Sequence, residues 1–207
     1  MKEFPCQLYL ISPLEVGGEF PGRLEAALAA GAVAAFQFRV KDLDQHEAAA
    51  LAEPLQAICA AHDVAFIVND SIALAKRLKA DGLHLGQRDG DVREARELLG
   101  RDAQSGVTCH NSRHLAMEAA EAGADYVAFG AFYPTATKTV EHVADLDTLQ
   151  KWSFVTEVPC VAIGGITPDN AKPLIDAGAD FIAVSGAVWN HPQGPAEAVK
   201  AFNALLA

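Results

Sequence analysis

Three polar side chains at alternate positions of one short segment are the first candidates for chemistry. Gln37, Arg39 and Lys41 end an apolar run, and alternate residues of an extended strand point to the same side. An unpaired amide, guanidinium and ammonium would be costly to bury in a core. Arginine offers a planar fork of donors and lysine a mobile point charge, which suits a phosphate or pyrophosphate. The alternative is a solvated strand end whose two cations project into water.

Two aspartates follow the next two apolar runs. Asp70 comes directly after Asn69, and Asp89 follows the segment 84–88. Mg²⁺ in proteins prefers a few carboxylates, water and substrate phosphates to an all-protein cage. The pair therefore predicts a Mg²⁺ site that faces the cationic row, although Asp70 could instead cap the following helix.

Hydroxyl and ammonium groups follow two later runs. Thr108 ends one of them, and Thr135, Thr137 and Lys138 lie close together after the next. Two hydroxyls and an ammonium at this spacing suit a phosphate-bearing ligand.

Glycine turns end the last two runs, at Gly164–Gly165 and at Ser185–Gly186. Glycine lets backbone N–H groups approach a phosphate closely at a helix N-terminus. We therefore expect two anion sites, one cationic and metal-assisted and the other built from backbone.

Other candidate groups are weaker. His110 and His114 are four residues apart and could chelate a metal, but no further ligand lies at the expected spacing. Cys109 could be a nucleophile, yet a small, semi-buried thiol is the favoured interpretation. His84 lies within an apolar run and is expected to be a hydrogen-bonded interior group.

Strand-like and helix-like segments alternate along the whole chain. Strands are expected at Gln7–Ser12, Val33–Arg39, Val64–Asn69, Gly82–Leu85, Ser105–Thr108, Tyr126–Gly130, Cys160–Gly164 and Phe181–Ser185. Helices are expected at Arg23–Ala30, Gln45–His62, Ile72–Lys79, Val92–Leu99, Ser112–Ala122, Leu146–Thr156, Pro168–Ala177 and Ala196–Leu206. Asn111 is expected to cap one helix, and Thr167 another that begins at Pro168. The strands are almost continuously apolar, which is typical of a parallel sheet buried on both faces.

An internal repeat supports the same organisation. Ala122–Phe132 resembles Ala177–Ala187, and Ala80–Gly86 is a shorter version. Eight strand–helix units in 207 residues predict a (β/α)8 TIM barrel with eight parallel strands, forming a single domain over residues 1–207. A doubly wound open sheet is the alternative, but the first strand is not followed by a Gly-rich dinucleotide turn. In such a barrel all the strand ends described above meet at one rim.

Composition excludes several classes of protein. The chain carries 16 Lys+Arg against 27 Asp+Glu, a net charge of −11, which argues against sequence-independent nucleic-acid binding. No apolar run is long enough to cross a membrane. The four cysteines are scattered without a CxxC pair, so we expect a reduced, cytoplasmic protein. Its partners are expected to be small molecules, and the sequence is compatible with a homo-oligomer.

The motifs resemble those of the thiamine-phosphate synthase family from the first strand to the last. They are Q-x-R-x-K at 37–41, N-D at 69–70, H-x-G-Q-x-D at 84–89 and P-T-x-T-K at 134–138. The family is a (β/α)8 barrel that joins an aminopyrimidine pyrophosphate to a thiazole phosphate and releases pyrophosphate. The resemblance implies this transferase activity in thiamine biosynthesis, with Mg²⁺ as cofactor.

The resemblance also implies a role for each motif residue. Gln37 would hold the aminopyrimidine; Arg39, Lys41, Asn69 and Lys138 the pyrophosphate; and Asp70 and Asp89 the Mg²⁺. Thr108 would lie near the reacting methylene, Thr135 and Thr137 between the substrates, and Gly165, Ser185 and Gly186 at the thiazole phosphate. Arg39, Lys41, Thr108 and Lys138 would be the catalytic residues.

Two alternatives use the same barrel. A thiazole tautomerase, an isomerase, would need only the monophosphate site, so the complete cationic row argues against it. A non-catalytic protein that binds thiamine phosphates is the other, supported by Ser185–Gly186 where the family has an apolar–Ser pair.

Overall fold

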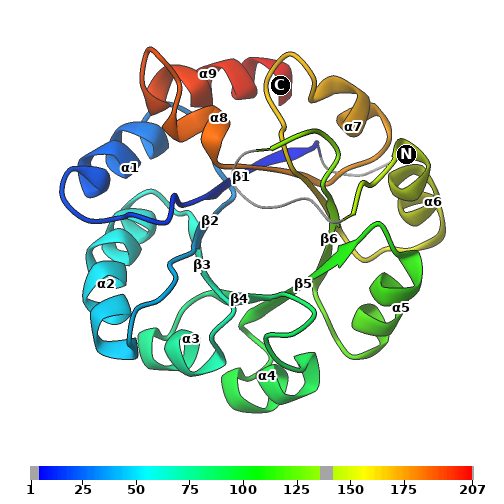
Figure 1. Cartoon of the computed structure of the whole chain (residues 1–207), viewed down its shortest axis with the longest axis horizontal. Coiled ribbons are helices and arrows are strands. Elements are labelled where there is room, and N and C mark those ends of the chain that lie inside the picture. The colour runs from blue at the N-terminus through cyan, green and yellow to red at the C-terminus, as the bar shows by residue number, and fades with distance from the viewer. Residues whose placement is uncertain (1–4, 136–141, 207) are drawn as a thin grey trace.

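Eight parallel strands close into a barrel in which each strand pairs with the next and β8 pairs with β1 (Figure 1). The computed structural model describes residues 5–135 and 142–206. The strands are β1 (Gln7–Ile11), β2 (Ala35–Phe38), β3 (Ala65–Asn69), β4 (Gly82–Leu85), β5 (Gln104–His110), β6 (Tyr126–Gly130), β7 (Cys160–Ile163) and β8 (Phe181–Val184). The predicted (β/α)8 barrel is confirmed, and each predicted strand end lies within two residues of the observed one.

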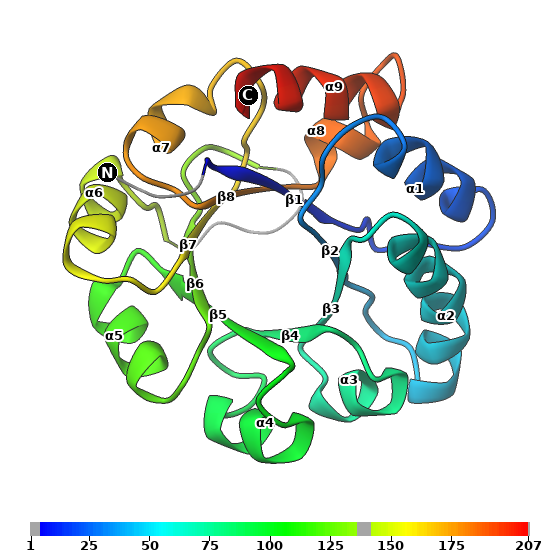
Figure 2. The same cartoon turned by 180° about the vertical axis from the view of Figure 1, so that it is seen from behind.

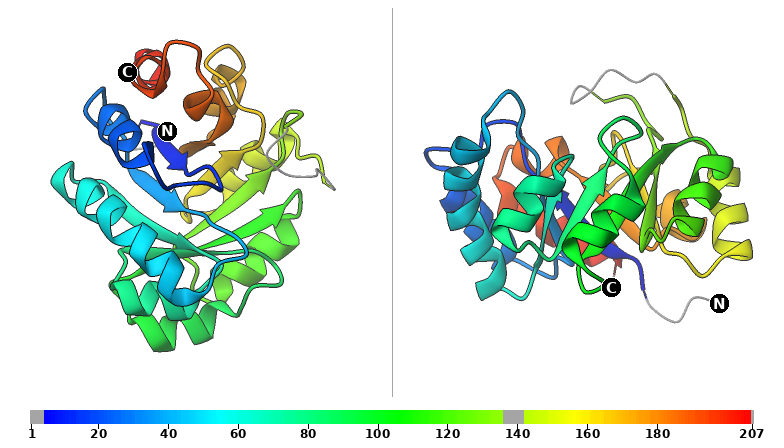
Figure 3. Two further views of the ribbon diagram at one scale, coloured as in Figure 1. Left: turned by 60° about the vertical axis from the view of Figure 1, so that its left-hand side comes forward. Right: turned by 90° about the horizontal axis from the view of Figure 1, so that it is seen from below.

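Helices surround the barrel on the outside, as the view from behind also shows (Figure 2). They are α1 (Phe20–Leu28), α2 (Gln45–Ala61), α3 (Ile72–Leu78), α4 (Val92–Leu99), α5 (Arg113–Glu121), α6 (Leu146–Val155), α7 (Lys172–Asp176), α8 (Gly186–Trp189) and α9 (Pro195–Leu206). The strand arrowheads point toward one end of the barrel (Figure 3). Loops that follow the strands therefore meet at that end. None of the described helices is long and apolar enough to cross a bilayer.

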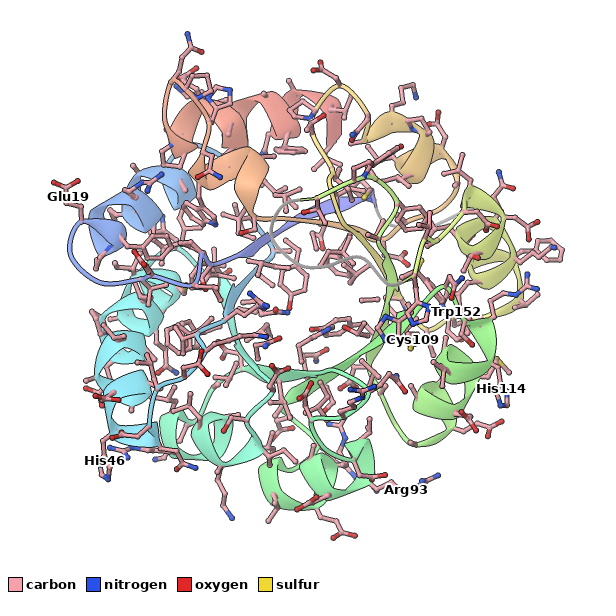
Figure 4. All side chains as sticks on the ribbon, viewed as in Figure 1. Glu19, His46, Arg93, Cys109, His114 and Trp152 are labelled. Atoms are coloured by element: carbon pink, nitrogen blue, oxygen red, sulfur yellow. The ribbon has the colours of Figure 1, made fainter. Side chains whose placement is uncertain are left out.

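The apolar strands bury side chains on both faces of the sheet. Between sheet and helices lies the larger core, to which β2 contributes Phe36 and Phe38. Inside the barrel lies a smaller one that includes Tyr9, Ile67 and Tyr126. Figure 4 shows Trp152 between the sheet and the helices, whereas Arg93 projects outward from α4. Two buried faces explain why these strands are apolar at successive positions.

The internal repeat has a structural cause at the opposite end of the barrel. Asp81, Asp125 and Asp180 each precede an even-numbered strand. Their carboxylates accept the backbone N–H of Phe66, Ser105 and Cys160 on the strand before, at 2.7, 2.6 and 2.7 Å. Each repeated aspartate therefore ties the start of one strand to the next.

The predicted cap of α5 is wrong by one residue. Ser112, not Asn111, is the N-cap, and its hydroxyl accepts the N–H of Leu115 at 3.2 Å. Residues 109–112 form a turn in which the Ser112 N–H donates to the Cys109 carbonyl at 2.9 Å. The helix therefore starts one residue later in the chain.

The predicted start of α7 is wrong by four residues. The helix begins at Lys172 rather than at Pro168, and Thr167 does not cap it. The Asn170 side chain accepts the N–H of Thr167 at 2.8 Å and donates to the Gly165 carbonyl at 3.0 Å. Such side-chain bonds to nearby backbone compete with a helix, so the segment forms a turn instead.

Candidate active site

Arg39 follows the end of β2 and is half-buried. Its backbone is fixed by Ser12, whose hydroxyl accepts the Arg39 N–H at 2.9 Å and donates to the Arg39 carbonyl at 3.1 Å. Within the part of the chain that the structure describes, its buried Nη1 has no hydrogen-bond partner. A buried guanidinium nitrogen without an acceptor is costly, so this position fits an anionic ligand.

Asp70 and Asp89 come together at the same rim. Burial, the charge of Asp89 and a hydrogen bond with it raise the pKa of Asp70 to about 6, while the charges of Arg39 and Lys41 lower it. The four predicted groups of the cationic and metal site are thus within electrostatic reach of one another. Lys41 itself is exposed.

Local backbone geometry holds the two carboxylates in place. Asp70 has a left-handed φ of 65° and donates its N–H to the His84 carbonyl at 2.8 Å. The Asp89 carboxylate accepts the Gly86 N–H at 3.1 Å, and a Cβ at Gly86 would collide with it. The alternative prediction, that Asp70 caps the following helix, is wrong, because Ser71 is the N-cap of α3.

The donor set fits Mg²⁺. Repulsion between the two carboxylates raises the pKa of Asp70, and a bound divalent cation would relieve that repulsion. Among residues 5–135 and 142–206 no group of three or more His, Cys, Asp or Glu side chains could hold a metal. A cation held by Asp70 and Asp89 would therefore complete its shell with water and phosphate oxygens.

Gln37 and Thr108 lie at the centre of the barrel mouth. The buried Gln37 donates its Nε2–H to the Tyr9 hydroxyl at 3.0 Å. The Thr108 hydroxyl lies 2.8 Å from Nε2 of His84, and its carbonyl accepts from Gln87 at 2.6 Å. The expectation that His84 is a hydrogen-bonded interior group is confirmed.

Two further polar residues inside the barrel were missed from the sequence. Tyr9 and Tyr126 are buried, and their hydroxyls lie 3.0 Å apart. Each stands in an apolar strand, where a tyrosine is expected as often as a phenylalanine. The available signal in the sequence was the hydroxyl of a tyrosine within an apolar strand, because a phenol that is buried requires a polar partner.

Glycines form the opposite side of the rim, at the end of β7. Gly165 has a φ of 64°, and a Cβ there would lie 2.8 Å from the Tyr133 carbonyl and collide with that of Pro134. The N–H of Tyr133 donates to the Gly164 carbonyl at 3.0 Å. The loop that carries Thr135 therefore lies directly against this turn.

Ser12 connects the two sides of the rim. The Ser185 hydroxyl donates to the Ser12 carbonyl at 3.4 Å, while the Ser12 hydroxyl holds Arg39. Gly186 begins α8, a short helix that was not predicted. Asn69 ends β3 beside His84. Thr137 and Lys138 lie outside the described residues, so their roles stay predictions.

Cys109 and His114, two of the weaker candidates, do not join this site. Cys109 is fully buried outside the barrel interior, and burial raises the pKa of its thiol to about 12, which makes it a poor nucleophile at neutral pH. His114 projects outward from α5 (Figure 4) and pairs with Glu118 on the same helix at 3.5 Å.

Comparison with known proteins agrees with the geometry. Residues 8–188 match the family model described as "Thiamine monophosphate synthase". A thiamine-phosphate synthase of Erythrobacter litoralis is 70% identical over 99% of this chain and 97% of its own length. One of Rhodospirillum centenum is 54% identical over 97% of this chain and 98% of its own.

A solved structure gives the same result. Thiamine phosphate pyrophosphorylase of Pyrococcus furiosus superposes with a TM-score of 0.86 at 30% identity, over 97% of this chain and 95% of that one. Family model, relatives and structure all cover the strands that carry the rim. The chain therefore belongs to the thiamine monophosphate synthase family.

Proposed function

We propose that this chain is a transferase that joins an aminopyrimidine pyrophosphate to a thiazole phosphate, giving thiamine phosphate and pyrophosphate. The observation that carries the proposal is the buried Nη1 of Arg39, which has no hydrogen-bond partner among the described residues and lies near the Asp70–Asp89 pair. This rim offers a positive fork and a divalent-cation site together, which is what a pyrophosphate leaving group requires.

The reaction exchanges one bond for another. The C–O bond between the pyrimidine methylene and the pyrophosphate breaks, and its electron pair leaves with the pyrophosphate. The electron-rich aminopyrimidine stabilises the cation that remains, and the thiazole nitrogen donates its lone pair to form the new C–N bond. Such a step needs charge stabilisation and alignment rather than acid–base groups. The proposed step therefore requires neither a Ser-His-Asp triad nor a pair of acid and base carboxylates.

The cationic side of the rim would hold the pyrophosphate. Arg39 would donate two parallel hydrogen bonds to its oxygens, with Lys41, Asn69 and Lys138 as further donors. Mg²⁺ bound to Asp70 and Asp89 would supply additional neutralisation of the leaving group. Both aspartates must be ionised for that role.

The pyrimidine would occupy the mouth of the barrel. Gln37 uses one N–H on Tyr9, which leaves its Oε1 and a second N–H for the aminopyrimidine edge. The Thr108 hydroxyl would lie next to the reacting methylene, with Thr135 and Thr137 between the two substrates.

The glycine side would take the thiazole phosphate through backbone N–H groups of Gly165 and the Ser185–Gly186 turn. A tautomerase would need only this half of the rim, so the assembled cationic half favours the synthase. Cytoplasmic location and assembly into a homo-oligomer stay predictions.

Purified protein incubated with both phosphorylated substrates tests the proposal. We expect thiamine phosphate and pyrophosphate to form in equal amounts, and only when Mg²⁺ and both substrates are present. Absence of product with all components present would refute the synthase activity and leave the binding-protein alternative.

A further inference from the structure

A continuous line of hydrogen bonds crosses the barrel interior from β2 to β5. Gln37 Nε2 donates to the Tyr9 hydroxyl at 3.0 Å, and that oxygen lies 3.0 Å from the Tyr126 hydroxyl. The Tyr126 oxygen lies 3.0 Å from Nδ1 of His84, whose Nε2 lies 2.8 Å from Oγ1 of Thr108. We call these five residues the interior relay.

Four of the five relay residues are buried. Tyr9, Gln37, Tyr126 and His84 are all less than a tenth exposed. The imidazole of His84 stacks on the ring of Tyr126, with centroids 5.6 Å apart. Gly106 on β5 leaves room for the Tyr126 ring, with which any Cβ there would collide.

Both phenols in the relay keep their protons. Burial raises the pKa of Tyr9 to about 12 and that of Tyr126 well above its ordinary value. Each phenol therefore has one proton to donate at neutral pH, and its oxygen can accept as well. If that proton is used within the relay, the phenol donates to one neighbour and accepts from the other.

Only one arrangement uses every phenol proton within the relay when Gln37 donates to Tyr9. In that arrangement Tyr9 donates to Tyr126, and Tyr126 donates to Nδ1 of His84. Neutral His84 then carries its proton on Nε2 and donates to Thr108. Thr108 is left with its own proton to donate into the mouth of the barrel. If the amide were turned, every bond would reverse, and the Thr108 proton would point back at His84.

We propose that Tyr9, Tyr126 and His84 are positioning residues that make the barrel mouth specific for an aminopyrimidine. Through the relay they hold Gln37 with its Oε1 acceptor toward the ligand and Thr108 with its O–H donor toward the ligand. The inference rests on the proposed function for the identity of that ligand.

The direction of the relay predicts which analogues are rejected. An amino group donates to Oε1, whereas an oxo group at the same position would place two acceptors face to face. Because a turned amide would reverse three further bonds along the relay, the site cannot adapt to the oxo analogue at low cost.

The proton position on His84 tests the relay without any substrate. Protein labelled with ¹⁵N-histidine is examined by NMR, and His84 is assigned by its absence from a His84→Asn variant. We expect a proton on Nε2 and a bare, hydrogen-bonded Nδ1. A proton on Nδ1, or on both nitrogens, at neutral pH would overturn the relay direction.

Two tyrosine variants within the interior relay test the interpretation of that spectrum. Tyr126→Phe is expected to move the Nδ1 resonance toward that of a nitrogen without a hydrogen bond. Tyr9→Phe leaves the Tyr126 hydroxyl beside His84 and is expected to leave that resonance in place. Tyr133→Phe, which removes a hydroxyl bonded to the Asn170 carbonyl at 2.8 Å, is a control outside the relay. An unchanged spectrum in Tyr126→Phe would contradict the proposal.

Substrate discrimination gives the functional readout. We expect Tyr9→Phe to reduce the preference for the amino substrate over its oxo analogue by roughly tenfold, the effect of one hydrogen bond. The KM for the thiazole phosphate should not change. Unchanged discrimination in an active Tyr9→Phe enzyme would refute the positioning role, whereas an inactive wild type would refute the proposed function and leave the NMR result intact.

Discussion

The two halves of the rim are built to bind anions in different ways. The cationic half, at the ends of β2–β4, consists of Arg39, Lys41, Asp70 and Asp89. The glycine half, at the ends of β7 and β8, presents backbone at Gly164–Gly165 and Ser185–Gly186. Charged side chains can move with a ligand whose charge changes, and they can bind a metal. Backbone N–H groups at a tight turn are fixed in position and fit a phosphate of one geometry. We therefore expect the side-chain half to hold the pyrophosphate leaving group and the backbone half to hold the phosphate that does not react.

Net charge shows why the distinction matters. The chain carries a formal charge of −11, yet Arg39 and Lys41 act on the same carboxylate at one rim. A net negative charge argues against sequence-independent nucleic-acid binding, but it does not exclude a phosphate at a local cluster of cations.

Arg39→Ala should have the largest effect. Loss of the half-buried guanidinium would remove stabilisation of the leaving group, and kcat should fall roughly 100- to 1000-fold. Arg93→Ala, on the outer face of α4 (Figure 4), removes the same charge away from the rim and is the control. Similar rates for the two variants in a steady-state assay would remove Arg39 from the site.

Gly165→Ala tests the fixed half. Its φ of 64° and the nearby carbonyls of Tyr133 and Pro134 leave no room for a methyl group. We expect kcat/KM for the thiazole phosphate to fall roughly tenfold or more, together with a loss of about 1–2 kcal/mol in the free energy of unfolding. Gly123→Ala, at a φ of 97° with open space around it, carries the backbone cost alone and should keep normal kinetics. Equal kinetic losses in both variants would show a general folding defect.

Asp89→Asn addresses the metal. Replacing one of two carboxylates should raise the half-saturating Mg²⁺ concentration roughly tenfold in an activity titration. Asp147→Asn, on the exposed surface of α6, controls for the lost charge. A Mg²⁺ titration that is the same in all three proteins would mean that the pair holds no metal.

The pH dependence of the Mg²⁺ requirement should show the smallest effect. Because the pKa of Asp70 is raised to about 6, protons compete with the metal below that pH. Half-saturation should rise about fourfold between roughly pH 7.5 and 5.5 in the wild type and less in Asp89→Asn, where the repulsion is lost. Without metal the same shift means that Asp70 favours folding most below its ordinary pKa, and that this contribution disappears as the pH rises through about 6. A requirement independent of pH would contradict the raised pKa.

The sequence predicted the cationic half almost completely. Alternate spacing of Gln37, Arg39 and Lys41 at the end of an apolar strand specifies a face, and parallel strands bring Asp70 and Asp89 to the same rim. These inferences needed only the period of a strand and the direction of a parallel sheet. That is why the barrel and its charged groups were found together.

Other features depend on contacts that sequence does not display. Tyr9 and Tyr126 are 117 positions apart, and only closure of the barrel brings their hydroxyls together. The start of α7 was missed because Asn170 uses its side chain on the backbone of Thr167 and Gly165. Such competition between local bonds is decided by packing around the turn rather than by propensity.

The most direct test of the two-half account measures both KM values for the same two variants. Arg39→Ala and Gly165→Ala are each assayed against the pyrimidine pyrophosphate and the thiazole phosphate. We predict a crossed pattern, in which Arg39→Ala raises the KM of the pyrophosphate substrate alone and Gly165→Ala that of the thiazole phosphate alone. If either variant raises both KM values by the same factor, the rim does not divide its substrates between a side-chain half and a backbone half.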